Sequence, residues 1–337
     1  MASPVVGVGA PALEQTLPPI TTRPTLRGHI QIMRIDHWVK NVFVLPGIIA
    51  AISSDPTHIA PNLWVNIVVG LFATCLVASS NYVINEVLDA PFDRFHPIKR
   101  ARPVPSGRVS IPLAYVEWIA LMLIGVGLGF IVSVGFAATL FILWVMGCLY
   151  NIPPIRSKDV PYIDVLSESV NNPLRMLAGW LIASTGSVAP ASLLLSYWMV
   201  GCFFMATKRY AEYREIGDPV RAASYRKSLA HYTLERLLVS ITFYASAAML
   251  FLGAFIMRYR LELIIAFPLV ALVMAIYLSL AFKQHSAAQN PESLYKERAL
   301  MAAVISCAVV MALLMVVDIP AMQTVFAPTA PTVLDRH

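Results

Sequence analysis

Residues 63–93 read LWVNIVVGLFATCLVASSNYVI followed by NEVLDAPFD. The first part, 63–84, is long and apolar enough to cross a bilayer, since a membrane helix needs about 20 predominantly apolar residues. The second part carries acidic side chains three and four residues apart, with an amide one turn before the middle acid, and a helix would bring them to one face. They are Asn85, Glu86, Asp89 and Asp93. The stretch therefore predicts a membrane helix that ends in a row of oxygen ligands.

This acidic row is typical of a site for a hard divalent cation. Mg²⁺ binds oxygen ligands, usually one or two carboxylates together with substrate phosphates. Without a cation, like charges three and four residues apart on a helix repel one another. Basic side chains that could neutralise phosphates follow directly, namely Arg94, His96, Lys99, Arg100, Arg102 and Arg108. We therefore expect an enzyme that handles a diphosphate at a membrane face; the alternative is a solvated loop whose acids and bases only balance each other.

The whole chain has the composition of a polytopic membrane protein. It is 58% hydrophobic and 13% charged, whereas soluble domains have roughly 25% charged residues. We predict an all-α bundle of about nine transmembrane helices at 39–54, 63–84, 111–131, 135–150, 163–183, 189–207, 237–257, 261–282 and 299–318. These helices form a single transmembrane domain over 23–318. The Pro- and Thr-rich segment 1–22 is predicted to be a disordered tail rather than a signal peptide, and 319–337 a C-terminal tail.

The positive charges predict the orientation. With the N-terminus inside, 21 of the 25 Lys and Arg residues fall in inner segments and three in outer ones. This bias predicts that the N-terminus and the long polar loops are cytoplasmic in a multi-pass protein of the inner (plasma) membrane. The positive charge suits anionic lipids and anionic substrates, so it does not require a nucleic acid as partner. The four cysteines lie in apolar segments without metal-ligand spacing, as buried packing residues do.

A second long inner loop, 208–236, is mainly cationic. Lys208 and Glu212 would share one helical face, and Arg209 lies on the next. An anion-binding surface explains this loop better than orientation alone, which needs fewer bases.

Further polar residues accompany the predicted spans. Lys40 lies at the start of the first span and is either an interfacial anchor or a ligand. Arg156 and Lys158 are either orientation markers or phosphate contacts. Arg175 lies inside the fifth span, where an ionisable group costs about 2.5–3.5 kcal/mol on insertion scales. We therefore expect Arg175 to face a cavity and a substrate; the alternative is a structural ion pair.

The acidic row resembles the Asn-Asp-x-x-Asp-x-x-x-Asp metal-binding motif of the UbiA superfamily of membrane prenyltransferases. Other segments between roughly 30 and 315 are similar to its decaprenyl-phosphate phosphoribosyltransferase branch. Residues 34–41 resemble an Arg-Pro-x-x-Trp-x-Lys-Asn motif, and residues 93–107 resemble that branch's loop. The branch also has segments similar to 161–166, 175–179 and Lys208-Arg209-x-x-Glu212. The chain departs from the pattern at Glu86, at Ile35-Asp36 and at Asn171-Asn172-Pro173.

The resemblance implies an Mg²⁺-dependent membrane transferase that moves a phosphoribosyl group from phosphoribosyl diphosphate to a polyprenyl phosphate and releases diphosphate. It implies that the acidic row holds Mg²⁺ and that the residues of catalysis are Asp89, Asp93, Lys208 and Arg209. Substrate would be bound by Lys40, Asn41, Lys99, Arg102, Arg156, Lys158, Arg175 and Glu212. Two other functions remain open: a prenyltransferase that moves an isoprenoid chain from its diphosphate to a small aromatic or other acceptor, and a transporter of anionic lipids. Assembly into a homo-oligomer also remains open.

Overall fold

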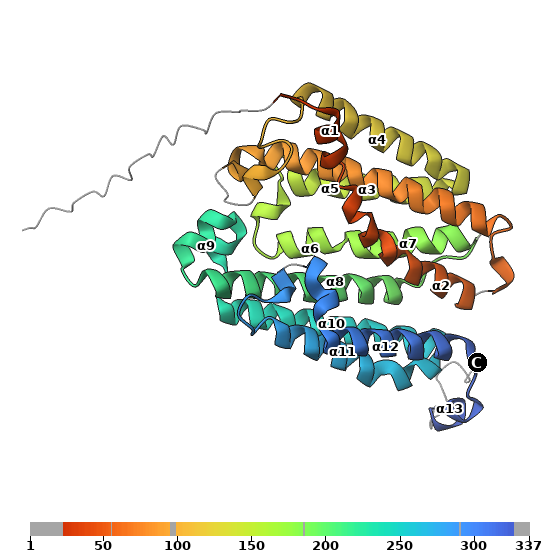
Figure 1. Ribbon diagram of the computed structural model, residues 1–337. Coiled ribbons are helices and arrows are strands. Elements are labelled where there is room, and N and C mark those ends of the chain that lie inside the picture. Colours follow the sequence, from red (N-terminus) through yellow and green to blue (C-terminus); the bar gives the residue numbers. More distant parts are fainter. Residues whose placement is uncertain (1–22, 55, 95–98, 185, 290, 327–337) are drawn as a thin grey trace, which may run out of the picture.

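The computed structural model describes residues 23–326 except 55, 95–98, 185 and 290. The predicted tail at 1–22, His96 and the last part of the predicted tail at 319–337 lie outside the described residues. Every regular element of the described chain is a helix, which confirms the all-α prediction. Figure 1 shows the long helices side by side, with α3, α4 and α5 on one side of the bundle and α10, α11 and α12 on the other.

Eight helical segments of the described chain are long and apolar enough to cross a membrane. They correspond to eight of the nine predicted spans, and the predicted polytopic bundle is therefore confirmed. Their bounds are Leu26–Ser54, made of α1 (Leu26–Ile32), the 3₁₀ helix η1 (Ile35–Val44) and α2 (Leu45–Ser54); α3 (Leu63–Asp93); α4 (Ile111–Val132); α5 (Val134–Asn151); α8 (Ala191–Ile216); α10 (Leu234–Tyr259); Leu261–Leu280, made of η6 (Leu261–Ala266) and α11 (Phe267–Leu280); and α12 (Arg298–Val316).

The remaining predicted span, 163–183, is divided into two shorter helices. These are α6 (Ile163–Ser169) and α7 (Asn171–Ala183), with Val170 between them. Pro173 lies in the first turn of α7, where its missing N–H removes no helical hydrogen bond. In an unbroken helix that continued from α6, Pro173 would lack the N–H for one helical hydrogen bond. The chain therefore begins a new helix here. α7 lies in the middle of the bundle and packs against α2, α3, α5 and α8.

Short helices close one end of the bundle, which we call the loop end. It comprises the described parts of 94–110, 152–162 and 217–233, including η3 (Lys99–Ala101), η4 (Ser157–Asp159), α9 (Pro219–Tyr225) and η5 (Lys227–His231). The Lys99 ammonium lies over the Tyr225 ring, 5.3 Å from its centre. The first and last of these loops therefore meet. The other short helices are η2 (Pro56–His58), η7 (Ala287–Gln289), η8 (Pro291–Lys296) and α13 (Pro320–Val325).

Two glycines let the N-terminal segment lie directly on α7. A Cβ at Gly47 would overlap the carbonyl oxygen of Met176, and a Cβ at Gly179 would overlap that of Val44. Only glycine permits such close backbone contact. The contact fixes η1 and α2 against α7, and so brings residues that are far apart in the sequence to one place inside the bundle.

The predicted orientation can be tested with single cysteines at the two ends of the bundle. Ser224 of α9 is exposed at the loop end, and Val188, between α7 and α8, is 89% exposed at the other end. With the loop end in the cytoplasm, an impermeant thiol reagent should label Val188→Cys in intact cells and Ser224→Cys only after the membrane is opened. The wild-type protein is the blank: Cys75, Cys202 and Cys307 are buried, and the half-buried Cys148, in α5, sets the background labelling. The reverse pattern would contradict the orientation drawn from the charges.

Candidate active site at the loop end

The acidic row forms the last turns of α3, where two of its members face α5 and η4. Lys158 Nζ donates to Asp89 Oδ1 at 2.6 Å, and Arg156 Nη2 donates to the same oxygen at 2.9 Å. Lys158 also donates to Asn151 Oδ1 at 3.0 Å, and Asn85 Nδ2 reaches that oxygen at 2.5 Å. Asn85 and Asp89 therefore belong to one network with Arg156 and Lys158. From the sequence alone, these two cations are either orientation markers or phosphate contacts.

The other two members of the row face the loop after α3. Glu86 accepts a hydrogen bond from the Val104 backbone N–H at 3.0 Å. Arg102 Nη1 donates to Asp93 Oδ2 at 2.7 Å, and Lys99 Nζ lies 3.9 Å from Asp93 Oδ1. Residues seven apart on a helix return to nearly the same angle, so Glu86 and Asp93 share this side. The row is helical as predicted, but its members contact two different loops.

The row offers hard oxygen donors, although the side chains do not already form a metal cluster. Among the described residues, no three His, Cys, Asp or Glu side chains gather as ligands of one metal ion. Asp89 Oδ2 and Asn85 Oδ1 accept no hydrogen bond from any described group, because the contacts above use only Asp89 Oδ1 and Asn85 Nδ2. A carboxylate and an amide oxygen suit Mg²⁺, which completes its shell with substrate phosphates and water. The donor chemistry of Asn85 and Asp89 therefore fits this ion.

The cations next to the row are partly withdrawn from water. Burial lowers the pKa of the Lys158 ammonium, and the neighbouring carboxylate of Asp89 acts in the opposite direction. Burial also lowers the pKa of Lys99, which Asp93 opposes in the same way. A partly dehydrated ammonium gains more from an anionic ligand than a fully hydrated one does. Both lysines are thus well placed to bind phosphate.

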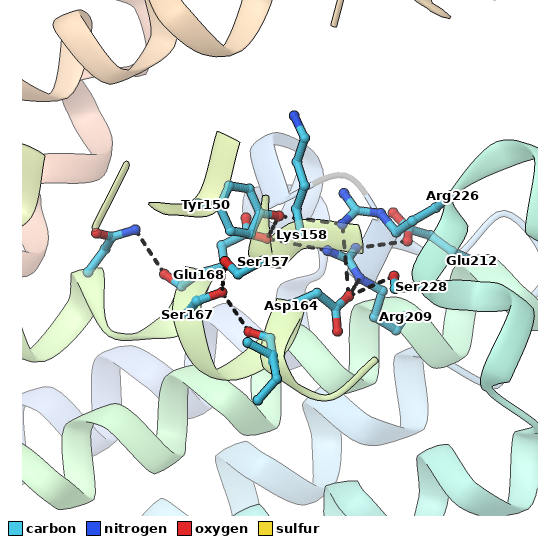
Figure 2. A network of polar contacts seen from close by, with 12 residues as sticks. Tyr150, Ser157, Lys158, Asp164, Ser167, Glu168, Arg209, Glu212, Arg226 and Ser228 are labelled. Carbon is cyan, nitrogen blue, oxygen red and sulfur yellow. Dashed lines mark hydrogen bonds and ion pairs between the residues drawn. The ribbon is translucent and has the colours of Figure 1, made fainter. Parts of the chain in front are cut away.

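A second polar network surrounds Arg209 of α8 and is drawn in Figure 2. The Arg209 side chain is 1% exposed. Its Nε donates to Asp164 at 3.1 Å, its Nη1 to Glu212 at 2.9 Å and its Nη2 to Glu168 at 3.3 Å. Each nitrogen of the guanidinium thus has its own carboxylate, two of them from α6 and one from α8.

Asp164 and Glu168 extend this network to the loops. Asp164 is fully buried and accepts hydrogen bonds from the Ser228 hydroxyl at 3.0 Å and the Tyr232 hydroxyl at 2.8 Å. Burial and the negative charge of Asp164 raise the pKa of the Tyr232 phenol, which therefore stays a donor. The Tyr150 hydroxyl donates to Glu168 at 2.7 Å. The network ties α6 and α8 to η5 and to the end of α5.

The structure separates the two residues predicted to clamp phosphate on the second loop. Lys208 is half-buried and forms no hydrogen bond or ion pair with the described side chains, while its charge acts on Glu168 and Glu212. Arg209, in contrast, is held by protein carboxylates on every side. A phosphate role for Arg209 and a substrate role for Glu212 remain predictions, and the geometry favours Lys208 as the residue that can reach a ligand.

Arg175 lies in the second turn of α7, away from these networks. Its Nε donates to Asn41 Oδ1 at 3.0 Å, and Asn41 Nδ2 donates to Cys75 Sγ at 3.1 Å. Among the described residues Arg175 forms no ion pair, and its predicted substrate role stays a prediction. Lys40, next to Asn41, lies 3.0 Å from His37 Nδ1 through its Nζ.

Several residues of these networks were not predicted. Asn151 and Tyr150 end α5 directly before the segment that carries Arg156, and Glu168 lies one helical turn after Asp164. The four-residue spacing of Asp164 and Glu168 on a helix is a signal that could have indicated Glu168. Nothing in the sequence indicates that Asn151 joins Asn85 to Lys158, because that contact depends on how α5 packs against α3.

Comparison with known proteins agrees with the motifs. Residues 42–304 match the model of the UbiA prenyltransferase family. The decaprenyl-phosphate phosphoribosyltransferase of Corynebacterium glutamicum is 32% identical over 216 residues, which are 61% of this chain and 60% of that protein. The one of Mycolicibacterium smegmatis is 30% identical over 234 residues, 67% of this chain and 69% of that protein. The chain thus spans about three fifths of the length of the first relative and rather more of the second.

The fold has relatives among solved structures. A UbiA homologue from Archaeoglobus fulgidus, bound to GPP and Mg²⁺, superposes with a TM-score of 0.65 at 19% identity and covers 86% of this chain and 99% of that one. The resemblance drawn from the acidic row and the accompanying segments is confirmed. The chain belongs to the UbiA prenyltransferase family, a family of membrane transferases.

Proposed function

We propose that the protein transfers a phosphoribosyl group from phosphoribosyl diphosphate to a polyprenyl phosphate and releases diphosphate. The observation that carries this proposal is the excess of cations at the loop end. Three carboxylates, those of Asp89, Asp93 and Asp159, are shared by the four cations Arg156, Lys158, Lys99 and Arg102. Lys208 has no ion-pair partner among the described residues. The donor has a diphosphate and a separate 5′-phosphate, and therefore needs more positive charge than a prenyl diphosphate does. The two relatives named above carry the same activity in their names.

The residues can be given separate roles in this reaction. An oxygen of the lipid phosphate forms a bond to the anomeric carbon of the ribose while the bond from that carbon to diphosphate breaks, and the electron pair leaves with diphosphate. The attacking phosphate is anionic at neutral pH, so no general base is needed, and positioning and electrostatics supply the catalysis. Lys158, Arg156 and Lys99 would hold the phosphates of the donor. Mg²⁺, held by Asn85 and Asp89, would withdraw charge from the leaving group.

The remaining residues support this arrangement from the protein side. Asp93 holds Arg102, and Glu86 fixes the backbone at Val104, so the loop that carries Lys99 is bound to α3. Both carboxylates could instead rotate toward Mg²⁺ when the donor binds, as the family motif implies. We also infer that the loop end faces the cytoplasm of the inner membrane, where a water-soluble donor can reach it.

A transfer assay tests the donor directly. Purified protein should convert labelled phosphoribosyl diphosphate and a polyprenyl phosphate into a lipid-linked product, and the rate should fall to background when Mg²⁺ is chelated and recover when it is restored. Turnover that is complete in excess chelator would contradict the metal assignment. Product formed from geranyl diphosphate and an aromatic acceptor, with none from phosphoribosyl diphosphate, would replace this proposal by the prenyltransferase alternative. Movement of labelled lipid across vesicles without any product would favour the transporter.

A further inference from the structure

Arg175 is a cation inside the membrane bundle that has no negative partner among the described residues. It lies in α7, in the span predicted at 163–183, and its one hydrogen bond among the described residues goes to the amide oxygen of Asn41. A charged side chain in a membrane segment normally faces a cavity or is paired with an opposite charge. Every other buried cation of the site has a carboxylate: Arg209 has three, and Lys158 has Asp89. The charge of Arg175 is therefore available for an anion that the protein itself does not supply.

The hydrogen-bond partner of Arg175 among the described residues is the neutral amide of Asn41. The Tyr197 hydroxyl lies 3.5 Å from the backbone oxygen of Phe43, in an exposed position between η1 and α8. Asn41 is 3% exposed and is held by Cys75, so it fixes the direction of the guanidinium. A fixed guanidinium without a carboxylate partner among the described residues suits a phosphate monoester.

The depth of Arg175 distinguishes a lipid phosphate from the donor. Cys75, which joins Arg175 through Asn41, precedes Asp89 by 14 residues of α3, or roughly 20 Å along the helix axis at about 1.5 Å per residue. Tyr82 lies between them, about 10 Å from Asp89 by the same measure. Arg175 is thus farther from the loop end than the cations around Asp89. A headgroup that enters from the bilayer can reach this level, whereas the water-soluble donor binds first at the loop end.

We propose that Arg175, oriented by Asn41, binds the phosphate of the polyprenyl phosphate acceptor. The inference rests on the proposed function, since it assigns the second substrate of the same site. In this arrangement the donor's diphosphate lies at Asp89, and the lipid phosphate approaches it from the side of α7 and η1. The arrangement separates the two substrates by depth: the soluble one is held by the loops and the lipid one by α7 and η1.

Binding and kinetics together test the role of Arg175. Arg175→Gln should weaken binding of a polyprenyl phosphate by on the order of ten- to a hundredfold, as expected for the loss of a charge-assisted hydrogen bond. It should leave binding of the polyprenol of the same chain length unchanged. The KM for the lipid phosphate should rise by the same factor, while the KM for phosphoribosyl diphosphate stays within about twofold. Arg175→Lys should recover part of the loss. Arg260→Gln, which removes a cation at the far end of α10, is the matched control and should change neither value.

A second variant keeps the test decisive if Arg175→Gln does not fold. Asn41→Asp retains an oxygen acceptor for Arg175 and supplies the missing negative charge, but it loses the hydrogen bond that Asn41 Nδ2 donates to Cys75 Sγ. The folded protein should keep most of its thermal stability while it loses affinity for the lipid phosphate. Equal lipid binding in Arg175→Gln, Asn41→Asp and wild type would overturn the inference. A raised KM for phosphoribosyl diphosphate with normal lipid binding would assign Arg175 to the donor instead. If wild type used a different donor, the proposed function would fail, but the comparison of lipid phosphate with polyprenol would still test Arg175.

Discussion

Replacing Asp89 by Asn should lower kcat/KM for phosphoribosyl diphosphate by on the order of a hundred- to a thousandfold. The carboxylate accepts charge-assisted hydrogen bonds from Lys158 and Arg156, each worth about 1.5–3 kcal/mol. The substitution also removes the anionic oxygen that fits Mg²⁺, and it leaves two cations close together without their shared counter-ion. Both changes act on the groups that hold the diphosphate, so the loss should appear in kcat as well as in KM. Steady-state kinetics with saturating Mg²⁺ measures it.

Asp159 is a matched control for this substitution. Its carboxylate accepts from Arg156 Nε at 3.1 Å, and its side chain is 25% exposed, compared with 24% for Asp89. It makes no contact with Lys158 or with α3 among the contacts that the structure describes. Asp159→Asn should therefore change kcat/KM by less than about threefold. Equal losses in both variants would mean that Asp89 matters only because it holds Arg156.

The membrane helices could be predicted because apolar length is a local property of the chain. The division of the fifth span at Val170 was not predicted, since the apolar content continues from 163 to 183 across it. The local signal was present, however: Pro173 and the two asparagines before it mark the start of a helix rather than its interior. The extension of α3 to Asp93 agrees with the spacing of the acidic row, because that spacing already assumed a helix.

The partners within the site could not be predicted in the same way. Spacing alone suggests that Glu86 and Asp89 face the same ligand, but two different loops approach α3 at these positions. The contact between Asn85 and Asn151 joins residues 66 apart in the sequence, and that between Arg175 and Asn41 joins residues 134 apart. Such contacts follow from the rotation of each helix in the bundle. Sequence reasoning therefore identified which residues are functional candidates better than it identified which residues they contact.

Arg209 and Lys208 should respond to substitution in different ways, although they are neighbours in one motif. Removing the positive charge in Arg209→Gln leaves Asp164, Glu212 and Glu168 without their shared cation, and two of these carboxylates are buried. Breaking a buried ion pair by removing one partner typically costs about 3–5 kcal/mol. We expect a marked fall in thermal stability and in the yield of folded protein. Arg209→Lys, which keeps the charge but cannot donate to three carboxylates in a fixed plane, should lie between this variant and wild type.

Lys208→Gln should instead leave stability near the wild-type value, because no carboxylate among the described residues depends on an ion pair with Lys208. If Lys208 binds a phosphate of the donor, its loss should raise the KM for phosphoribosyl diphosphate by on the order of tenfold or more. Thermal unfolding in detergent and steady-state kinetics on the same samples separate the two effects. A folded, stable Arg209→Gln with a strongly raised KM would return Arg209 to the phosphate-binding role that the motif implies. In that case its carboxylate partners would have to release it when the donor binds, and Glu168, the most exposed of the three at 35%, would be the first to do so.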